Sequence, residues 1–140
     1  MKNLAILLIL FCACSKSLNN NFPANQLKWT STKRVNYEFT LRISCYCTTE
    51  RIGPHLIKVT DGKIVSVNNQ PYDPTKTGTL MTIDELIAYI KTSVDKNPYI
   101  KKIEYNANFG YPEHVYFDFV KEIADEEIGF DITNYKEIVG

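Results

Sequence analysis

The sequence predicts an α+β domain built on a single antiparallel β-sheet of about six strands, with a helix packed on one face. Several short segments alternate apolar and polar residues, which is typical of strands that bury one face and expose the other. Residues 82–96 instead repeat apolar residues at helical spacing behind a capping box. A sheet of half-buried strands has one apolar face, and we expect the helix to cover it.

The N-terminus has the order of a secretory signal peptide: a basic start, an apolar run over residues 4–11, and small residues after it. The run is too short to cross a bilayer core, which needs about 20 residues in a helix. Ala13 and Cys14 resemble a bacterial lipobox, in which a peptidase cuts before a cysteine that is then lipidated. We expect residues 1–13 to be removed and Cys14 to carry the lipid. The alternative is an ordinary signal peptide with incidental cysteines.

Residues 14–25 are polar, rich in asparagine and without an apolar period, so we expect a flexible lipidated tether. Residues 26–140 are then a single domain, since their length suits one domain and not two. Removing residues 1–13 takes away only one of the 16 basic residues and none of the 16 acidic ones, which leaves one net negative charge. The absence of a basic stripe in the sequence argues against nucleic acid as a partner.

The first predicted strand is the longest alternating segment, residues 35–47, in which every second residue is apolar or cysteine. A short helix is expected before it, around Leu27 and Trp29. Gly53 and Pro54 break the chain after it.

A hairpin follows at residues 55–67. A two-residue turn at Asp61–Gly62 would put the apolar residues of its two strands out of phase. We therefore predict a three-residue loop, Thr60–Gly62, with Gly62 in the left-handed bulge position. That register places four apolar residues on one face: Ile57, Val59, Val65 and Val67.

The best helix in the chain begins at Thr82, which forms a capping box with Glu85, and is predicted to cover Ile83–Lys96. Asn97–Pro98 ends it, because proline disfavours helix at the residue before it. One apolar stripe is expected to face the sheet: Ile83, Leu86, Ile87, Ile90 and Val94.

Three more alternating segments complete the chain, at residues 103–109, 115–119 and 128–132. The order of a helix and three strands thus occurs twice. Pro54 and Pro112 align with apolar residues three and five positions after each. The two αβββ halves are either structural repeats or a coincidence among short amphipathic strands, and both interpretations give one antiparallel sheet.

A series of short motifs runs in order through residues 29–132: Trp29; Tyr37, Phe39 and Leu41; Cys45-Tyr46-Cys47; Val59-Thr60-Asp61-Gly62-Lys63; Thr82-Ile83-Asp84-Glu85-Leu86; Gly110-Tyr111-Pro112; Asp118; and Asp125-Glu126-Glu127-Ile128. This set resembles an uncharacterised family of small bacterial secreted proteins and lipoproteins, known only as a domain of unknown function. The resemblance implies an envelope location and a small α+β domain. It implies no activity, cofactor or catalytic residue.

Cys45 and Cys47 are the first candidate for chemistry. In a regular strand their Cβ atoms would lie about 7 Å apart, and a disulfide needs about 3.8 Å. A bulge near the strand end would allow a disulfide, which an oxidising envelope favours. Otherwise the thiols stay reduced on the core face, or ligate a metal with His55 and His114, although this spacing is a weak zinc pattern.

His114, Tyr116 and Asp118 share the polar face of one predicted strand and offer a base, a phenol and a carboxylate. No nucleophile motif or oxyanion loop accompanies them, so a solvated strand face is the simpler interpretation. If both long strands lie under the helix, Arg42 and Tyr46 point to the same open face. Tyrosine and arginine are enriched in recognition surfaces.

The sequence therefore predicts no catalytic residue, metal ligand or cofactor. It favours a binding module over an enzyme: a lipoprotein of the bacterial cell envelope, facing the periplasm, that contacts the membrane through its lipid and binds an envelope protein or glycan. The alternative is a thiol- or metal-dependent activity centred on Cys45 and Cys47.

Overall fold

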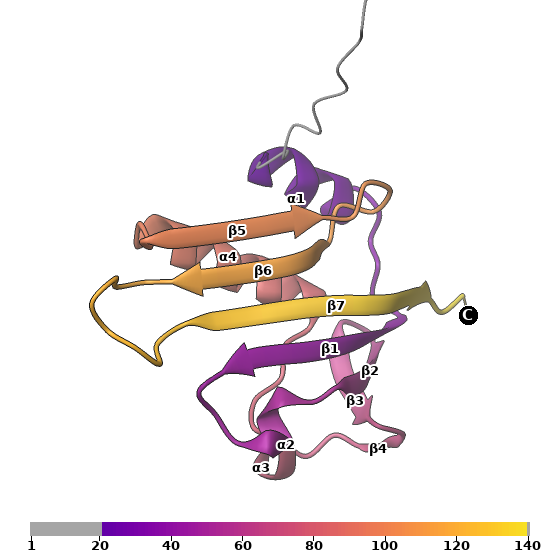
Figure 1. The fold of residues 1–140 in the computed structure, drawn as a ribbon. Helices are drawn as coiled ribbons and strands as arrows, with labels where there is room; N and C mark the ends of the chain where they lie inside the picture. The colour runs from indigo at the N-terminus through magenta and orange to yellow at the C-terminus, as the bar shows by residue number, and fades with distance from the viewer. Residues whose placement is uncertain (1–20, 140) are drawn as a thin grey trace, which may run out of the picture.

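The computed structural model describes residues 21–139 as one α+β unit (Figure 1). Its elements in chain order are α1 (Phe22–Thr30), β1 (Tyr37–Cys45), α2 (Thr49–Ile52), β2 (His55–Thr60), β3 (Lys63–Val67), β4 (Gln70–Pro71), α3 (Pro74–Thr77), α4 (Ile83–Asp95), β5 (Ile100–Tyr105), β6 (Pro112–Asp118) and β7 (Ile128–Glu137). The strands form one 7-stranded antiparallel sheet in the order β4-β3-β2-β1-β7-β6-β5. The predicted fold class is confirmed, and the short edge strand β4 is the addition to it.

The two αβββ groups expected from the sequence are present in chain order, as α1-β1-β2-β3 and α4-β5-β6-β7. They join where β1 pairs with β7, so the first strand of one group lies beside the last strand of the other. This pairing places β7 between β1 and β6, which the sequence did not reveal.

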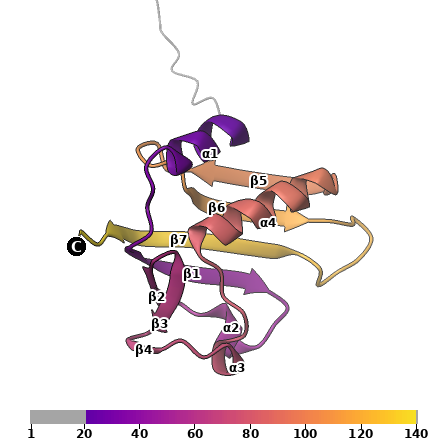
Figure 2. The ribbon, with the colours of Figure 1, turned by 180° about the vertical axis from the view of Figure 1, so that it is seen from behind.

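Helix α4 crosses β5, β6 and β7 on one face of the sheet (Figure 2). Its capping box is present: the Thr82 hydroxyl accepts from the Glu85 N–H at 3.2 Å, and the Glu85 carboxylate accepts from the Thr82 N–H at 2.7 Å. The predicted stripe is buried at Ile83, Leu86, Ile87 and Ile90, and half-buried at Val94.

Helix α1 begins at Phe22, four residues before the predicted start of the domain. The Asn21 side chain accepts from the Ala24 N–H at 3.3 Å, and Pro23 occupies the first turn, where the missing N–H of proline carries no penalty. This Asn-Phe-Pro segment, predicted to be part of the tether, is the start of a helix. Of the two apolar residues around which this helix is predicted, Trp29 is buried and Leu27 is exposed.

The hairpin register predicted from the sequence is wrong. Thr60 pairs with Lys63, so the turn has two residues, Asp61 and Gly62. Their φ angles are both positive, 49° and 73°, as the favoured two-residue hairpin turn requires.

The predicted three-residue loop would bring the apolar residues of β2 and β3 into phase. In the structure, a β-bulge at Val65 changes the phase instead. The ladder shifts between Val59 and Lys58, and Val65, the extra residue on β3, is 43% exposed. Beyond the bulge, Val67 lies opposite Ile57 on the buried face. A bulge is well tolerated near a sheet edge, whereas the predicted register requires an unbroken ladder of paired residues.

The C-terminal ends of two strands, β5 and β7, differ most from those predicted. Strand β5 ends at Tyr105 because the Asn106 side chain accepts from the N–H groups of Asn108 and Phe109, at 3.0 and 2.9 Å, and folds the chain into a turn. Strand β7 continues to Glu137, well past the predicted end.

We expect Leu86→Ala to lower the free energy of unfolding by about 2–5 kcal/mol, because the side chain is only 2% exposed between α4 and the sheet. Lys91→Ala, on the exposed side of the same helix, should change it by less than about 0.5 kcal/mol. Urea denaturation measures both, and equal losses would mean that the buried stripe is misplaced.

Candidate functional site

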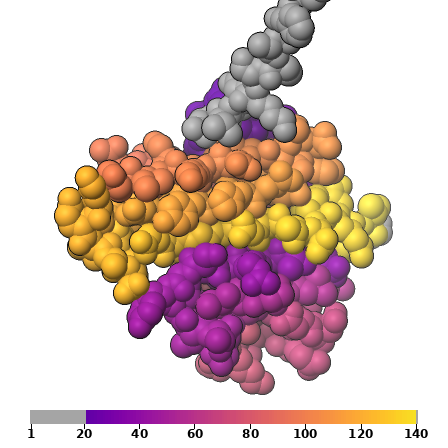
Figure 3. All heavy atoms as spheres, viewed as in Figure 1, coloured from indigo at the N-terminus to yellow at the C-terminus, as the bar shows by residue number. Residues whose placement is uncertain are grey.

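Among residues 21–139, no helix lies over β1, β7, β6 and β5 on the face of the sheet opposite α4 (Figure 3). Alternation along β1 builds it: the odd-numbered residues from Tyr37 to Ile43 are at most 1% exposed, whereas Arg42 and Ser44 are exposed on the other side. We call this surface the open face. It carries the residues that the sequence analysis proposed for binding.

One row of side chains crosses the open face at Asp131. Asp131 lies opposite Arg42 on β1 and opposite His114 on β6, and its Oδ1 is 2.6 Å from His114 Nδ1. Arg42 and His114 thus share a face as predicted, but they flank Asp131 and are not neighbours. Asp131 is not among the residues predicted for this face, because the strand pattern shows that its position is polar but not that it lies between the two other strands.

A second row of residues lies beside the first. Ser44, Gly129 and Tyr116 are in register across β1, β7 and β6. A Cβ atom on Gly129 would lie 3.3 Å from the Val115 carbonyl oxygen, 3.4 Å from Ser44 Cβ and 3.7 Å from Tyr116 Cδ2, so the neighbouring groups pack closely around the glycine. A hollow of about 310 Å³ near this row is lined by Ser44, Cys45, Tyr46, Tyr116, Asp125 and Glu127.

A disulfide joins Cys45 to Cys47 at the rim of this hollow, with a Cα–Cα distance of 5.3 Å. Strand β1 ends at Cys45, and the Cys47 N–H donates to the Cys45 carbonyl at 2.9 Å, so the chain turns sharply at the residue between. That residue, Tyr46, projects with 83% of its surface exposed.

The four side chains of the metal hypothesis are not brought together. His55 is buried on the helix-covered face, opposite Leu41, and its Nε2 lies 3.0 Å from the Arg51 carbonyl oxygen. His114 lies on the open face, and the two cysteines are bonded to each other. Within residues 21–139 no cluster of three or more His, Cys, Asp or Glu side chains has an arrangement that suits a metal ion.

The end of the open face near Asp118 is acidic. Burial raises the pKa of Asp118, and the neighbouring Glu126 and Glu127 raise it further. The pKa of Tyr116 is raised by burial and by Glu127, Asp118 and Glu126. His114 is paired with Asp131 at 2.6 Å, and the pKa of Asp118 is raised by Glu126, so both ends of the polar row along β6 are influenced by residues outside the strand.

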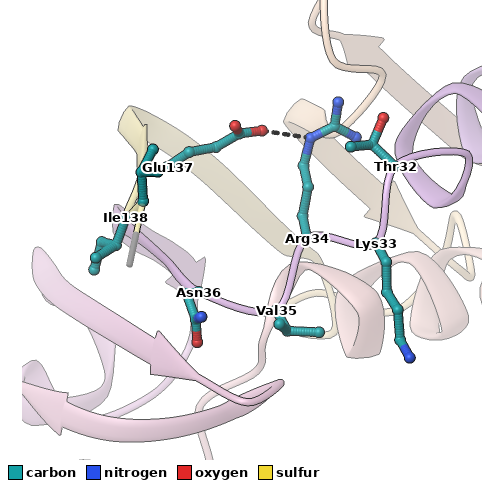
Figure 4. A pocket seen from close by; sticks show the side chains of 8 residues that line it. Thr32, Lys33, Arg34, Val35, Asn36, Glu137 and Ile138 are labelled. Carbon is teal, nitrogen blue, oxygen red and sulfur yellow. Dashed lines mark hydrogen bonds and ion pairs between the residues drawn. The ribbon is translucent and has the colours of Figure 1, made fainter.

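A different hollow, of about 210 Å³, lies where the link between α1 and β1 meets the end of β7 (Figure 4). Arg34 Nε is 2.6 Å from Glu137 Oε1 across it, and the guanidinium lies 5.2 Å from the ring centroids of both Trp29 and Phe109. Arg34 Nη1 also donates to the Trp29 carbonyl at 2.8 Å. These partners make Arg34 a structural residue, one that the sequence analysis did not single out.

The fold and the open face together define a small α+β domain that presents an uncovered antiparallel sheet with polar and aromatic side chains. The chain belongs to the family of unknown function DUF6174, whose model matches residues 21–137. No curated protein and no solved structure is significantly similar to it. Among the helices described in residues 21–139, none is long and apolar enough to span a membrane.

Asp118→Asn should raise the melting temperature at neutral pH. The pKa of this carboxyl is higher in the folded protein than in the unfolded chain, so stability falls as the pH rises through the unfolded and then the folded pKa. Below both values the carboxyl is protonated in either state, and the substitution should have little effect. Thermal unfolding by circular dichroism at neutral and acidic pH tests this, and a gain that is equal at both would contradict it.

Proposed function

We propose that this protein is a non-enzymatic binding domain, held at a bacterial membrane surface by a lipid on Cys14, that docks an envelope protein or glycan through its open face. The observation that carries the proposal is that, in the part of the chain that the structure describes, no helix covers this face of β1, β7, β6 and β5. A sheet face left open in a domain of this size is available for contact with another molecule. The exposed side chains on it are those that such contacts favour.

Two tyrosines make the hollow that they line the centre of the proposed contact. Tyr116 lines it from β6, and Tyr46 projects beside it from the disulfide turn. Tyrosine offers a large, fairly rigid contact area with a polar tip, and a fixed backbone lowers the entropy lost on binding. Arg42 in the next row adds a group that donates several hydrogen bonds.

The proposed anchor keeps the domain close to its membrane. Residues 1–20, including Cys14, lie outside the part of the chain that the structure describes. Cys14 precedes Phe22 by eight residues, and a chain of that length spans at most about 28 Å. A partner of the open face is then a component of the same envelope, on the periplasmic side.

A thiol-dependent activity is the second candidate, because the Cys45–Cys47 disulfide lies at the rim of the Tyr116 hollow. Such an activity needs the dithiol form, in which a nucleophilic thiolate is available. The pair lacks the Cys-x-x-Cys spacing at a helix start that lowers a thiol pKa in thioredoxin-type sites. Turnover of a dithiol or disulfide substrate that is lost in Cys45→Ser would favour this candidate.

The Tyr46→Ala, Tyr116→Ala double variant should stay folded and lose the partner captured by crosslinking in intact cell envelopes. The variant removes both aromatic walls of the hollow, and Tyr46 makes little contact with the rest of the domain. Tyr99→Ala is the matched control, since Tyr99 is 54% exposed and lies outside the hollow. Full capture by the double variant would place the contact elsewhere, most reasonably on the loop at residues 71–78.

Cys14→Ala should abolish labelling of the protein by a radioactive or clickable fatty acid and block or redirect removal of the signal peptide. The acyl chains contribute about 0.8 kcal/mol per buried CH₂, so the variant should also leave the membrane fraction. Labelling that persists in the variant would rule out Cys14 as the anchor.

A further inference from the structure

Strand β5 is a regular edge of the sheet with no strand on its outer side in residues 21–139. It pairs with β6 without interruption from Ile100 to Glu104, and the register shifts only before Tyr105. Helix α1 lies just beyond the outer edge of β5 at its C-terminal end, on the side of the sheet that α4 covers, so the N-terminal part of the strand is the freer part of this edge (Figures 1 and 2). It contacts the loop after the strand, where Lys28 Nζ donates to the Ala107 carbonyl at 2.7 Å.

The opposite edge of the sheet, at β3 and β4, is less regular than β5. There β4 covers the end of β3, and the bulge at Val65 distorts the rest. Bulges and short edge strands are common devices that stop a sheet from pairing with another chain. Strand β5 has neither over its first five residues, so its outward N–H and C=O groups form a regular row.

The side chains of β5 restrict what can pair with it. Lys102 and Glu104 point to the open face, opposite Tyr116 and His114, and both are exposed. Ile103 between them points to the helix-covered face and is 9% exposed. Unpaired lysines normally discourage edge pairing, but here a lysine and a glutamate alternate on one face.

A second copy of β5 can add in antiparallel fashion about a two-fold axis perpendicular to the sheet. Residues that oppose each other must then lie on the same face, so the axis passes through a residue and not between two. An axis at Lys101, Lys102 or Glu104 places that residue opposite its own copy, and like charges directly opposite each other are unfavourable. An axis at Ile103 instead pairs Lys102 of each copy with Glu104 of the other.

We propose that β5 is a homodimer edge, at which two copies pair in the register centred on Ile103 and join their sheets into one. The pairing is self-complementary in charge, with two symmetric Lys102–Glu104 contacts and continuous backbone hydrogen bonding. The two-fold axis keeps both open faces on one side of the joined sheet and both α4 helices on the other. The dimer therefore doubles the open face, and its small interface makes it a weak complex in solution.

Carbodiimide crosslinking of a mixture of unlabelled and ¹⁵N-labelled protein tests the register directly. The reagent joins an amine to a carboxylate only when the two are in contact, and the mixed isotopes separate links between copies from links within one. The expected product is a mixed-isotope peptide pair that joins Lys102 to Glu104. A mixed-isotope product that lacks this pair, or no mixed product at all, overturns the proposal.

Charge reversal supplies the second test, by sedimentation of the folded domain over a hundredfold range of concentration. Lys102→Glu and Glu104→Lys each turn two attractive contacts into repulsive ones, and each should weaken the dimer by roughly tenfold or more. The double variant restores opposite charges and should recover wild-type dimerisation.

Lys58→Glu is the matched control for the charge-reversal variants, because Lys58 is also exposed on the same side of the sheet but lies on β2, away from the β5 edge. It should dimerise as the wild type does. A wild-type protein that stays monomeric throughout, or a double variant as weak as the single ones, overturns the proposal.

Discussion

The packing of Trp29 is the interaction on which the rest of the fold depends, because it connects segments that are distant in the sequence. Its indole is 1% exposed and meets the rings of Tyr37, Tyr111 and Tyr135 edge-on, at centroid distances of 5.6, 6.1 and 5.7 Å. The indole N–H donates to Asp84 at 3.1 Å, in the first turn of α4. Burying an indole of this size contributes about 4–6 kcal/mol. One side chain thereby ties α1 to β1, β7 and α4.

The same cluster explains why the start of α4 is held firmly against the sheet. The Tyr37 hydroxyl accepts from the Ile83 N–H at 3.2 Å, so a strand side chain satisfies one of the free donors at the helix N-terminus. Burial raises the pKa of Tyr37 well above its usual value, which keeps the phenol neutral and able to remain in the core. With α1 and α4 both fixed on one face, the apolar side of every long strand is covered, and no helix of residues 21–139 covers the opposite side.

The open face is therefore a consequence of how the core is covered. Within it, one local feature shapes the surface beside the hollow: the Cys45–Cys47 disulfide, which turns the chain and presents Tyr46. The two edges of the sheet also differ from each other. The edge at β3 is covered by β4 and interrupted by a bulge, whereas the edge at β5 is regular. Binding on the face and pairing at the β5 edge use different surfaces, so a single domain can do both.

The sequence by itself determined the properties that depend on local periodicity. Period-two alternation identified the long strands, the Thr82–Glu85 capping box identified α4, and both placed Arg42 and His114 on the face away from the helix. These follow from backbone geometry over a few residues, which the side-chain pattern reports directly.

Only the tertiary structure decided which strands are neighbours and where the ladder is interrupted. Asp131 lies between Arg42 and His114 because β7 pairs with β1, and the hairpin keeps its two-residue turn because Val65 bulges. Arg34 is held by rings and a carboxylate that lie far from it in the chain. Such contacts are selected by burial summed over the whole core, and no local pattern in the sequence encodes that sum.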